Sequence, residues 1–573
     1  MATLSGTEFL VNTSFLNEQS LSDITGLTNG RFVVTWQDLS QTAPDTSGYA
    51  TRAQIFNADG SRFGAEFVVN TTTTSFQLEG RVSGLNNGGF VATWTDFNPG
   101  GGDISGGAAI RGQIFDAAGT KVGAEFLVNT TTLNGQNESA VTTLKDGRFV
   151  VTWTDQSDIS GLFPTADIRA QIFAANGTKS GAEFIVNSQR DADQYNSEIT
   201  ALKNGGFVVT WTDAQPRLDD NSFSAVRMQV YSAGGFAVGG ETLVNSTTLG
   251  QQLQSRVTAL ENGRFVVSWT DISLTGGDTS VDSVRARIFT AAGVPVGLEF
   301  VVNTTTSLSQ NQSTIVALPD GRFVAAWRDF SATGADTSGA AIRAQVFNAN
   351  GNPAGAEFVV NTTVLGFQFD PAITALADGR FVVSWTDFSQ TFVDVSGFAI
   401  RAQIFDARTA AISLNGTAQG DDYLGTKFAD DLKGAGGGDR LSGAQGHDTL
   451  IGGAGADTLI GGAGADLLHG GPGKDLLTGG GGADRFIFAS AAEAGIGGSR
   501  DRISDFGNGA DKIDLSGFMA GGQFVGSGPF GAAGDVRFDA GSAILSGDVD
   551  GDGGADFEIK LSGISPTAGD FIF

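Results

Sequence analysis

Seven tryptophans at an almost constant spacing constrain the fold of this chain more than any other feature. Successive tryptophans lie 58 or 59 residues apart, which indicates a structural repeat. Their positions are Trp36, Trp94, Trp153, Trp211, Trp269, Trp327 and Trp385. Each unit contains four short strand-like runs separated by turn sequences such as Asp146-Gly147, and no run has a helical period. The sequence therefore predicts repeated units of four antiparallel strands.

Seven such units predict an all-β fold, a seven-bladed β-propeller over residues 1–408. The chain opens with a strand-like run at residues 8–12, whereas the last unit ends at Phe405 without its fourth strand. We therefore expect the N-terminal run to complete the last blade and close the ring. An array of sandwiches or an open solenoid is the alternative, although a solenoid would need capping units at its ends.

Three polar residues recur in every unit: an Asp and then an Arg that follow the tryptophan, and a Gln that precedes the tryptophan. In the first unit these residues are Asp38, Arg52 and Gln19. Sevenfold repetition favours a structural latch over a ligand surface, with Asp and Arg paired across one hairpin and Gln bonded to the next blade. Recurring Asp-x-Ser loops are a weaker candidate for binding a cation or a sugar, at Asp45, Asp103, Asp278, Asp336 and Asp394.

The fourth unit departs most from the repeat, and its two long polar loops are predicted to lie on one face of the propeller. Charged and aromatic side chains gather in these loops and form the candidate ligand site: Arg190, Asp191, Asp193, Tyr195, Arg217, Asp219 and Asp220. Surface loops that have drifted in sequence are the competing explanation.

A second period, of nine residues, runs over residues 416–487. Glycine occupies the first position of eight successive units, aspartate the sixth and a large apolar residue the eighth. The glycines permit tight turns with exposed carbonyls, and the apolar residue points inward from a very short strand. Two nonapeptides form one coil, so the aspartates stack in columns at the strand spacing of about 4.8 Å.

Stacked carboxylates repel each other unless a cation lies between them. Carboxylate and carbonyl oxygens at a flexible spacing suit Ca²⁺, which is the predicted cofactor. The predicted ligands are the aspartates and the fourth-position glycines of the last six units: Asp439, Asp448, Asp457, Asp466, Asp475, Asp484, Gly437, Gly446, Gly455, Gly464, Gly473 and Gly482.

Residues 416–487 resemble the RTX, or haemolysin-type, calcium-binding repeats, whose Gly-Gly-x-Gly-x-Asp-x-apolar-x pattern folds as a parallel β-roll. The first two units depart from it, with Gln419 and Phe428 in place of the fourth-position glycine, so the number of occupied calcium sites is not predicted. Residues 501–515 resemble the C-terminal cap of serralysin-like RTX proteins, and residues 570–573 resemble the tail of their uncleaved type I secretion signal.

The resemblance implies a calcium-binding β-roll over residues 409–490, followed by a cap with the secretion signal over residues 491–573. It also implies a type I secretion exporter as a partner. The expected location is therefore secreted, extracellular or cell-surface-associated, in a Gram-negative bacterium.

Composition and missing motifs exclude several functions. A net charge of −28 disfavours nucleic acids and anionic membranes, no apolar run approaches the length of a membrane span, and the absence of cysteine excludes thiol chemistry. The two histidines, His447 and His469, form no His-Glu-x-x-His motif, which excludes zinc proteolysis of the serralysin type. No Gly-x-Ser-x-Gly motif is present either.

The acidic loop at residues 548–553 begins like an EF-hand, but Ile559 replaces the closing Glu, which favours a polar hairpin turn.

These observations favour a secreted, calcium-binding, noncatalytic propeller that binds or adheres to a glycan or a cell surface. The alternatives are an extracellular hydrolase that acts on polysaccharide through carboxylates near the fourth unit, and a surface-layer or filament subunit. Paired carboxylates about 5–9.5 Å apart in the channel mouth would favour the hydrolase. A channel lined by symmetric Gln and Thr would favour binding.

Overall fold

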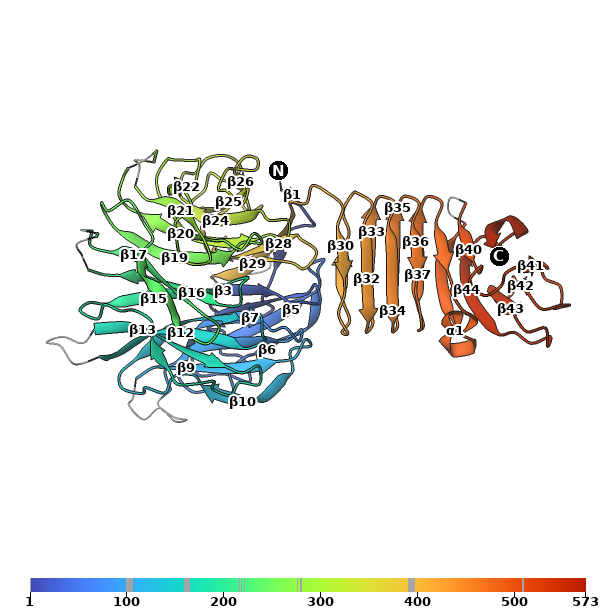
Figure 1. Ribbon diagram of the computed structural model, residues 1–573, viewed down its shortest axis with the longest axis horizontal. Helices are drawn as coiled ribbons and strands as arrows, with labels where there is room; N and C mark the ends of the chain where they lie inside the picture. Colours follow the sequence, from blue (N-terminus) through green and yellow to red (C-terminus); the bar gives the residue numbers. More distant parts are fainter. Residues whose placement is uncertain are drawn as a thin grey trace. The chain divides into compact units, whose positions relative to one another are not determined.

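The computed structural model describes residues 2–98, 107–158, 165–215, 217, 219–220, 222–275, 277–278, 281–389, 397–507 and 510–573. The chain forms two compact units, one made of residues 1–28 and 32–407 and the other of residues 29–31 and 408–573. Figure 1 colours both units along the sequence. We describe each unit by itself.

The first unit is a seven-bladed propeller in which six blades are four-stranded antiparallel sheets and the seventh has five strands. Six blades take their strands in chain order: β3 (Gln19–Gly26), β4 (Phe32–Asp38), β5 (Ala50–Phe56) and β6 (Arg62–Val68); β7 (Gln77–Gly84), β8 (Phe90–Asp96), β9 (Ala109–Phe115) and β10 (Lys121–Leu127); β11 (Gln136–Thr143), β12 (Phe149–Asp158), β13 (Thr165–Phe173) and β14 (Phe184–Ile185); β15 (Gln194–Ala201), β16 (Phe207–Asp213), β17 (Ala225–Tyr231) and β18 (Ala237–Leu243); β19 (Gln252–Ala259), β20 (Phe265–Asp271), β21 (Ser283–Phe289) and β22 (Phe300–Val301); β23 (Gln310–Ala317), β24 (Phe323–Asp329), β25 (Ala341–Phe347) and β26 (Phe358–Val359).

The seventh blade joins the two ends of the propeller. It consists of β27 (Gln368–Ala375), β28 (Phe381–Asp387) and β29 (Ala399–Asp406), completed by the N-terminal strands β1 (Thr3–Leu4) and β2 (Phe9–Leu10). Both N-terminal strands pair with β29 antiparallel, with Phe9 opposite Ala402 and Leu10 opposite Arg401. The predicted closure of the ring is confirmed.

Buried tryptophans fill the interfaces between blades. All seven tryptophan side chains are fully buried. Trp36 on β4, for example, packs in one core cluster with Ile400 and Ala402 on β29 of the neighbouring blade. Since truncating a buried tryptophan to alanine typically costs about 3–5 kcal/mol, these side chains stabilise the ring strongly.

The second unit is a parallel β-roll whose two sheets continue into the C-terminal segment. Its strands are β30 (Ser413–Asn415), β31 (Asp422–Leu424), β32 (Asp431–Gly436), β33 (Arg440–Gln445), β34 (Thr449–Ala454), β35 (Thr458–Ala463), β36 (Leu467–His469), β37 (Leu476–Gly481), β38 (Arg485–Ile487), β39 (Asp501–Phe506), β40 (Lys512–Asp514), β41 (Gln523–Phe524), β42 (Asp535–Asp539), β43 (Ile544–Asp548), β44 (Phe557–Gly563) and β45 (Phe571–Ile572). Its helical turns are α1 (Ala491–Ala494), η1 (Gly497–Ser499) and η2 (Ala568–Asp570).

Two nonapeptides form each coil of the roll, as predicted. Leu432 pairs with Leu450 on one sheet, and Leu441 pairs with Leu459 on the other, each 18 residues further along the chain. These leucines are fully buried between the two sheets. None of the described helices combines the length and the hydropathy needed to cross a membrane.

Candidate calcium sites and a candidate ligand pocket

The turns of the roll fit glycine because successive coils approach each other closely. Gly455 has φ of +150°, and a Cβ atom built on it would lie 1.4 Å from the carbonyl oxygen of Gly437 in the preceding coil. Gly464 has the same relationship to the carbonyl oxygen of Gly446. Only glycine leaves room for these stacked carbonyls.

The aspartates form two columns that are linked by backbone hydrogen bonds. The amide of Asp439 donates to Oδ1 of Asp457 at 2.8 Å, and the amide of Asp448 donates to Oδ1 of Asp466 at 2.9 Å. In six residues the second carboxylate oxygen, Oδ2, is buried and has no hydrogen-bond partner among the described parts of the chain: Asp439, Asp448, Asp457, Asp466, Asp475 and Asp484. An ionised oxygen buried in this way is strongly destabilising unless a cation binds it.

Burial and mutual repulsion also change how these carboxyl groups ionise. Burial is the main cause that raises the pKa of Asp439 and of Asp448 from 3.8 to about 7, and the neighbouring aspartates add to it. Burial likewise raises the pKa of Asp475 and of Asp484 to about 6. A divalent cation between the coils would restore the charged form. The carboxylate oxygens that lack a hydrogen-bond partner, together with the exposed carbonyl oxygens of the glycine turns, therefore fit Ca²⁺ well.

The first two nonapeptides, which form the first coil, differ from the others. Asp421 accepts a hydrogen bond from the Thr417 amide at 2.7 Å, and Asp430 accepts one from the Thr426 hydroxyl at 3.0 Å. Both carboxylates are thus satisfied by the chain itself, so these two nonapeptides fit calcium less well. A threonine at the second position of the nonapeptide is the sequence signal, in addition to the missing fourth-position glycine.

Both columns continue beyond the nonapeptides into the cap. The Asp475 amide donates to Oδ1 of Asp501 at 2.7 Å, and the Asp484 amide donates to Oδ1 of Asp511 at 3.1 Å. Oδ2 of Asp501 is buried without a partner among the described residues, and burial raises the pKa of Asp501 to about 8. Asp501 was not predicted as a ligand because it falls outside the nine-residue period. In the nonapeptides an apolar residue follows the aspartate two positions later, and the cap keeps this pattern, with Ile503 after Asp501 and Ile513 after Asp511.

The acidic loop at residues 548–553 is a hairpin turn between β43 and β44, as expected. Asp548, Asp550 and Asp552 place ligand atoms within 4.8 Å of one another. However, the Asp548 carboxylate already accepts hydrogen bonds from the amides of Gly551 at 2.7 Å and Gly553 at 2.9 Å.

The recurring polar residues of the propeller form a structural latch in each blade. In the first blade Arg52 pairs with Asp38 at 2.6 Å and with Glu66 at 3.0 Å. Gln19 donates to Asp38 of its own blade at 3.0 Å, and its Oε1 accepts from Asn12 at 3.2 Å. Asn12 follows β2 of the seventh blade, so the glutamine contacts the preceding blade, and the expected contact with the next blade is wrong.

The Asp-x-Ser loops also have structural roles. Asp45, Asp278 and Asp336 each accept a hydrogen bond at 2.8 Å from an asparagine that follows the fourth strand of the blade: Asn70, Asn303 and Asn361, respectively. These contacts leave no support for a cation or sugar site at the three loops. Asp103 and Asp394 lie outside the described residues.

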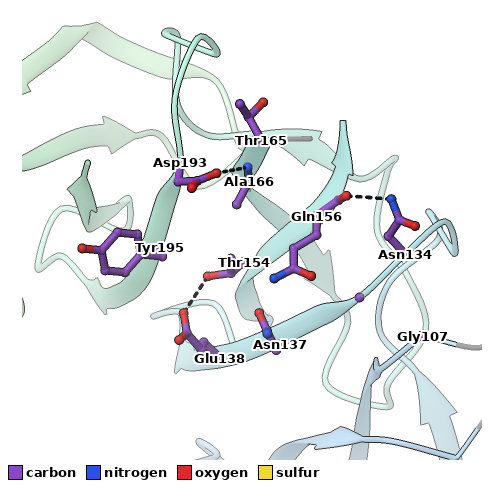
Figure 2. A pocket seen from close by; sticks show the side chains of 11 residues that line it. Gly107, Asn134, Asn137, Glu138, Thr154, Gln156, Thr165, Ala166, Asp193 and Tyr195 are labelled. Atoms are coloured by element: carbon purple, nitrogen blue, oxygen red, sulfur yellow. Dashed lines mark hydrogen bonds between the residues drawn. The ribbon is translucent and has the colours of Figure 1, made fainter. Parts of the chain in front are cut away.

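Most of the candidate ligand residues of the fourth unit are held in ion pairs or hydrogen bonds. Arg190 pairs with Asp167 at 2.8 Å, and Arg217 pairs with Asp213 and with Asp191, the latter at 3.0 Å. Asp219 pairs with Arg227 at 2.7 Å, and Asp220 accepts from Asn245 at 2.6 Å. Asp193 and Tyr195 instead line a pocket (Figure 2).

The pocket lies between the loops and strands of the third and fourth blades and has a volume of about 720 Å³. Amide, hydroxyl and carboxylate side chains dominate its lining: Asn134, Asn137, Glu138, Thr154, Gln156, Thr165, Asp193 and Tyr195, together with Gly107, Gly135 and Ala166. Asp193 accepts a hydrogen bond from the Ala166 amide at 2.9 Å, and Glu138 accepts one from Thr154 at 2.9 Å (Figure 2). Burial raises the pKa of Tyr195, and the negative charges of Glu138 and Asp193 raise it further.

A second cavity, of about 330 Å³, is enclosed by the first strands of all seven blades. Its charged residues are the carboxylates Asp23, Glu79, Glu138, Glu198 and Asp370 and the arginines Arg81 and Arg256. Glu198 of the fourth blade pairs with Arg256 of the adjacent fifth blade at 2.8 Å and with Arg81 of the non-adjacent second blade at 3.4 Å. The lining is therefore neither symmetric nor made of Gln and Thr alone. It was not predicted from the sequence because these positions differ in residue type from blade to blade.

The fold and the aspartate columns define this chain as a β-propeller followed by an RTX-type calcium-binding β-roll. Two family models match the second unit. The RTX calcium-binding nonapeptide repeat (4 copies) matches residues 415–450, and the Peptidase M10 serralysin C terminal matches residues 441–573. These matches confirm the resemblance that the nonapeptide and cap sequences indicate, and they confirm calcium as the cofactor.

Solved structures resemble the chain in fold only. A protein of unknown function from Dyadobacter fermentans DSM 18053 is 13% identical, with 71% of this chain and 99% of that chain covered and a TM-score of 0.43. The Penicillium chrysogenum α-L-arabinanase complexed with arabinobiose is 13% identical, with 70% and 99% covered and a TM-score of 0.41. The NanB sialidase from Streptococcus pneumoniae is 8% identical, with 70% of each chain covered and a TM-score of 0.38. At such scores no activity follows for this chain. No curated protein matches it in sequence.

Proposed function

We propose that this chain is a secreted calcium-binding protein whose propeller binds an extracellular glycan without cleaving it. In this proposal residues 409–490 form the calcium-dependent roll, and residues 491–573 form a cap that carries the signal for a type I exporter. The roll folds when calcium becomes available outside the cell, and the propeller then presents its ligand pocket in the medium or at a cell surface.

The observation that carries the glycan proposal is the lining of the pocket between the third and fourth blades. Its volume lies within the range of small-molecule sites, about 300–1,000 Å³. Amides such as Asn137 and Gln156 donate and accept hydrogen bonds side by side, as a ligand with many hydroxyl groups requires. Tyr195 adds an aromatic surface against which the apolar face of a sugar ring can pack.

The calcium part of the proposal rests on the six nonapeptide aspartates whose Oδ2 atom has no hydrogen-bond partner among the described residues. Asp439, Asp457 and Asp475 on one column, and Asp448, Asp466 and Asp484 on the other, would hold Ca²⁺ with the carbonyls of the fourth-position glycines. Calcium there supplies positive charge between coils that otherwise repel each other. It supplies no chemistry to the propeller.

A glycan array with the full-length protein tests the binding proposal. We expect binding to a defined set of glycans, and a loss of at least about 10-fold in affinity, about 1.4 kcal/mol, on Tyr195→Ala or Gln156→Ala. Asp59→Asn, an exposed substitution in a hairpin turn of the first blade, is the matched control and should bind normally. A blank array with correctly folded protein contradicts the proposal.

A carboxylate-dependent hydrolase is the second candidate, because the central cavity brings two carboxylates of adjacent blades together. Glu79 and Glu138 both line it, and the Glu138 amide donates to Oε2 of Glu79 at 3.0 Å. Release of reducing ends from a bound polysaccharide, abolished by Glu79→Gln or Glu138→Gln, would establish this activity and overturn the noncatalytic proposal.

A further inference from the structure

The charge of the ligand pocket is entirely negative among its described lining residues. Glu138 and Asp193 are the two charged side chains there, and no described lysine or arginine lines the pocket. The Glu138 carboxylate accepts hydrogen bonds from the Thr154 hydroxyl and from the Asn196 amide, and the Asp193 carboxylate accepts one from the Ala166 amide.

The arginines of the fourth unit do not offset this charge, because carboxylates already neutralise them. Arg190 pairs with Asp167, which is almost fully buried, and Arg217 pairs with Asp213 and Asp191. An acidic ligand would have to break one of these ion pairs to gain a guanidinium partner, and leaving a buried carboxylate unpaired is costly.

The central cavity extends the same negative field. Glu138 lines both cavities, so the two share a wall. In the central cavity five carboxylates stand against two arginines, and both arginines pair with Glu198. The raised pKa of Tyr195, to which Glu138 and Asp193 contribute, is consistent with this negative environment.

We propose that the pocket between the third and fourth blades selects glycans that carry a protonated amine over neutral and acidic ones. The inference rests on the proposed glycan binding and names the ligand class of the same site. An ammonium group gains Coulomb energy from Glu138 and Asp193 in a partly desolvated pocket, and the ring of Tyr195 provides a cation–π surface. A uronic acid or another acidic sugar meets repulsion at the same positions.

Three tetrasaccharides of equal length test this selection by titration calorimetry with the full-length protein in calcium. They are a glucosamine tetraose, its fully N-acetylated counterpart and a galacturonic acid tetraose, all at pH 5.5, where the sugar amine is protonated. We expect the amine-bearing tetraose to bind about 10-fold or more tightly than the N-acetylated one, and the acidic one to bind weakest. Raising the salt concentration should reduce the preference, since salt screens charges that solvent reaches.

Glu138→Gln and Asp193→Asn keep the size of the two side chains and one acceptor oxygen in each, while they remove the charge. Each should lower the preference for the amine about 10-fold, whereas Asp59→Asn should leave it unchanged. If the wild-type protein binds the N-acetylated tetraose as tightly as the amine, the inference is wrong although glycan binding stands. If no tetraose binds, both the inference and the proposed function fail. If a variant does not fold, the salt dependence of the wild-type protein still tests whether charge causes the preference for the amine. A preference that does not change with salt concentration overturns the inference.

Discussion

The carboxylate of Glu8 accepts a hydrogen bond from the amide of Thr362 at 2.7 Å, although 354 residues separate the two in sequence. The same carboxylate pairs with Arg401 at 3.1 Å and accepts from Thr363. Burial alone would raise the pKa of Glu8, but the hydrogen bonds from Thr363 and Thr362 outweigh it and lower the pKa. Glu66 makes the equivalent contacts with Thr13 and Arg52 in the first blade. The interface between the sixth and seventh blades is therefore built like the interface that Glu66 forms, and it depends on the N-terminal segment.

Removing residues 1–13 should open the ring. The deletion leaves β29 as an unpaired edge and exposes the apolar interface around Trp36, which favours aggregation. We expect lower cooperativity in thermal unfolding and a lower melting temperature, measured by tryptophan fluorescence, because all seven tryptophans lie in the propeller. Glu8→Gln in the full-length protein should cost about 1–3 kcal/mol. A truncated protein that melts like the intact one would show that the N-terminal strands do not close the ring.

Two aspartates of the roll should respond differently to the same substitution. Oδ2 of Asp457 is buried without a partner among the described residues, whereas the Asp430 carboxylate accepts hydrogen bonds from Thr426. Asp457→Asn should therefore raise the calcium concentration at the folding midpoint several-fold. Asp430→Asn should change this midpoint much less, even though both residues occupy the sixth position of a nonapeptide. Equal effects of the two substitutions would show that the first nonapeptides bind calcium like the others.

Lowering the pH should have opposite effects on the calcium-free and the calcium-bound roll. The pKa values of Asp439 and Asp448 rise on folding from 3.8 to about 7, so folding without metal disfavours their charged forms. That penalty is absent below about pH 4, grows as the pH rises from about 4 to about 7, and is constant above that range. The calcium-free roll should thus have more β structure at pH 5 than at pH 8, as measured by circular dichroism. Calcium must displace these protons, so the calcium midpoint should be higher at pH 6 than at pH 8. A midpoint independent of pH would contradict this account.

Periodic residues allowed most of the fold to be predicted from the sequence. Trp36 and its six equivalents define the blades, and Asp439 with the following aspartates defines the coils. Each repeat occupies the same environment, so a small number of positions determines the structure of the whole array. Glu8 could be assigned to the last blade because that blade alone lacked a fourth strand.

Residues that interrupt the periods were harder to predict. Asp501 continues an aspartate column 26 residues after Asp475 instead of the regular 18, because α1 and η1 lie in the segment before it, so no fixed spacing points to it. Glu79 and Glu198 come from different blades and line the same cavity because the blades form a ring. Arg190 and Arg217 were recognised in the sequence because the fourth unit departs from the repeat there. The sequence did not indicate that carboxylates neutralise both arginines.

The central claim is that calcium determines whether the roll folds. Each nonapeptide buries little more than one large apolar side chain, worth about 1.5–3 kcal/mol, against the large entropy cost of ordering glycine-rich coils. Extracellular modules bind calcium at about 10⁻⁴–10⁻³ M, well above cytosolic levels, so residues 416–487 should be unfolded inside the cell.

Circular dichroism of the isolated fragment of residues 410–573, titrated with calcium and in parallel with magnesium, tests this claim most directly. We predict a disordered spectrum in chelator, a cooperative gain of β signal with calcium in the range of about 10⁻⁴–10⁻³ M and no such gain with magnesium. A full β signal already present in chelator would contradict the account.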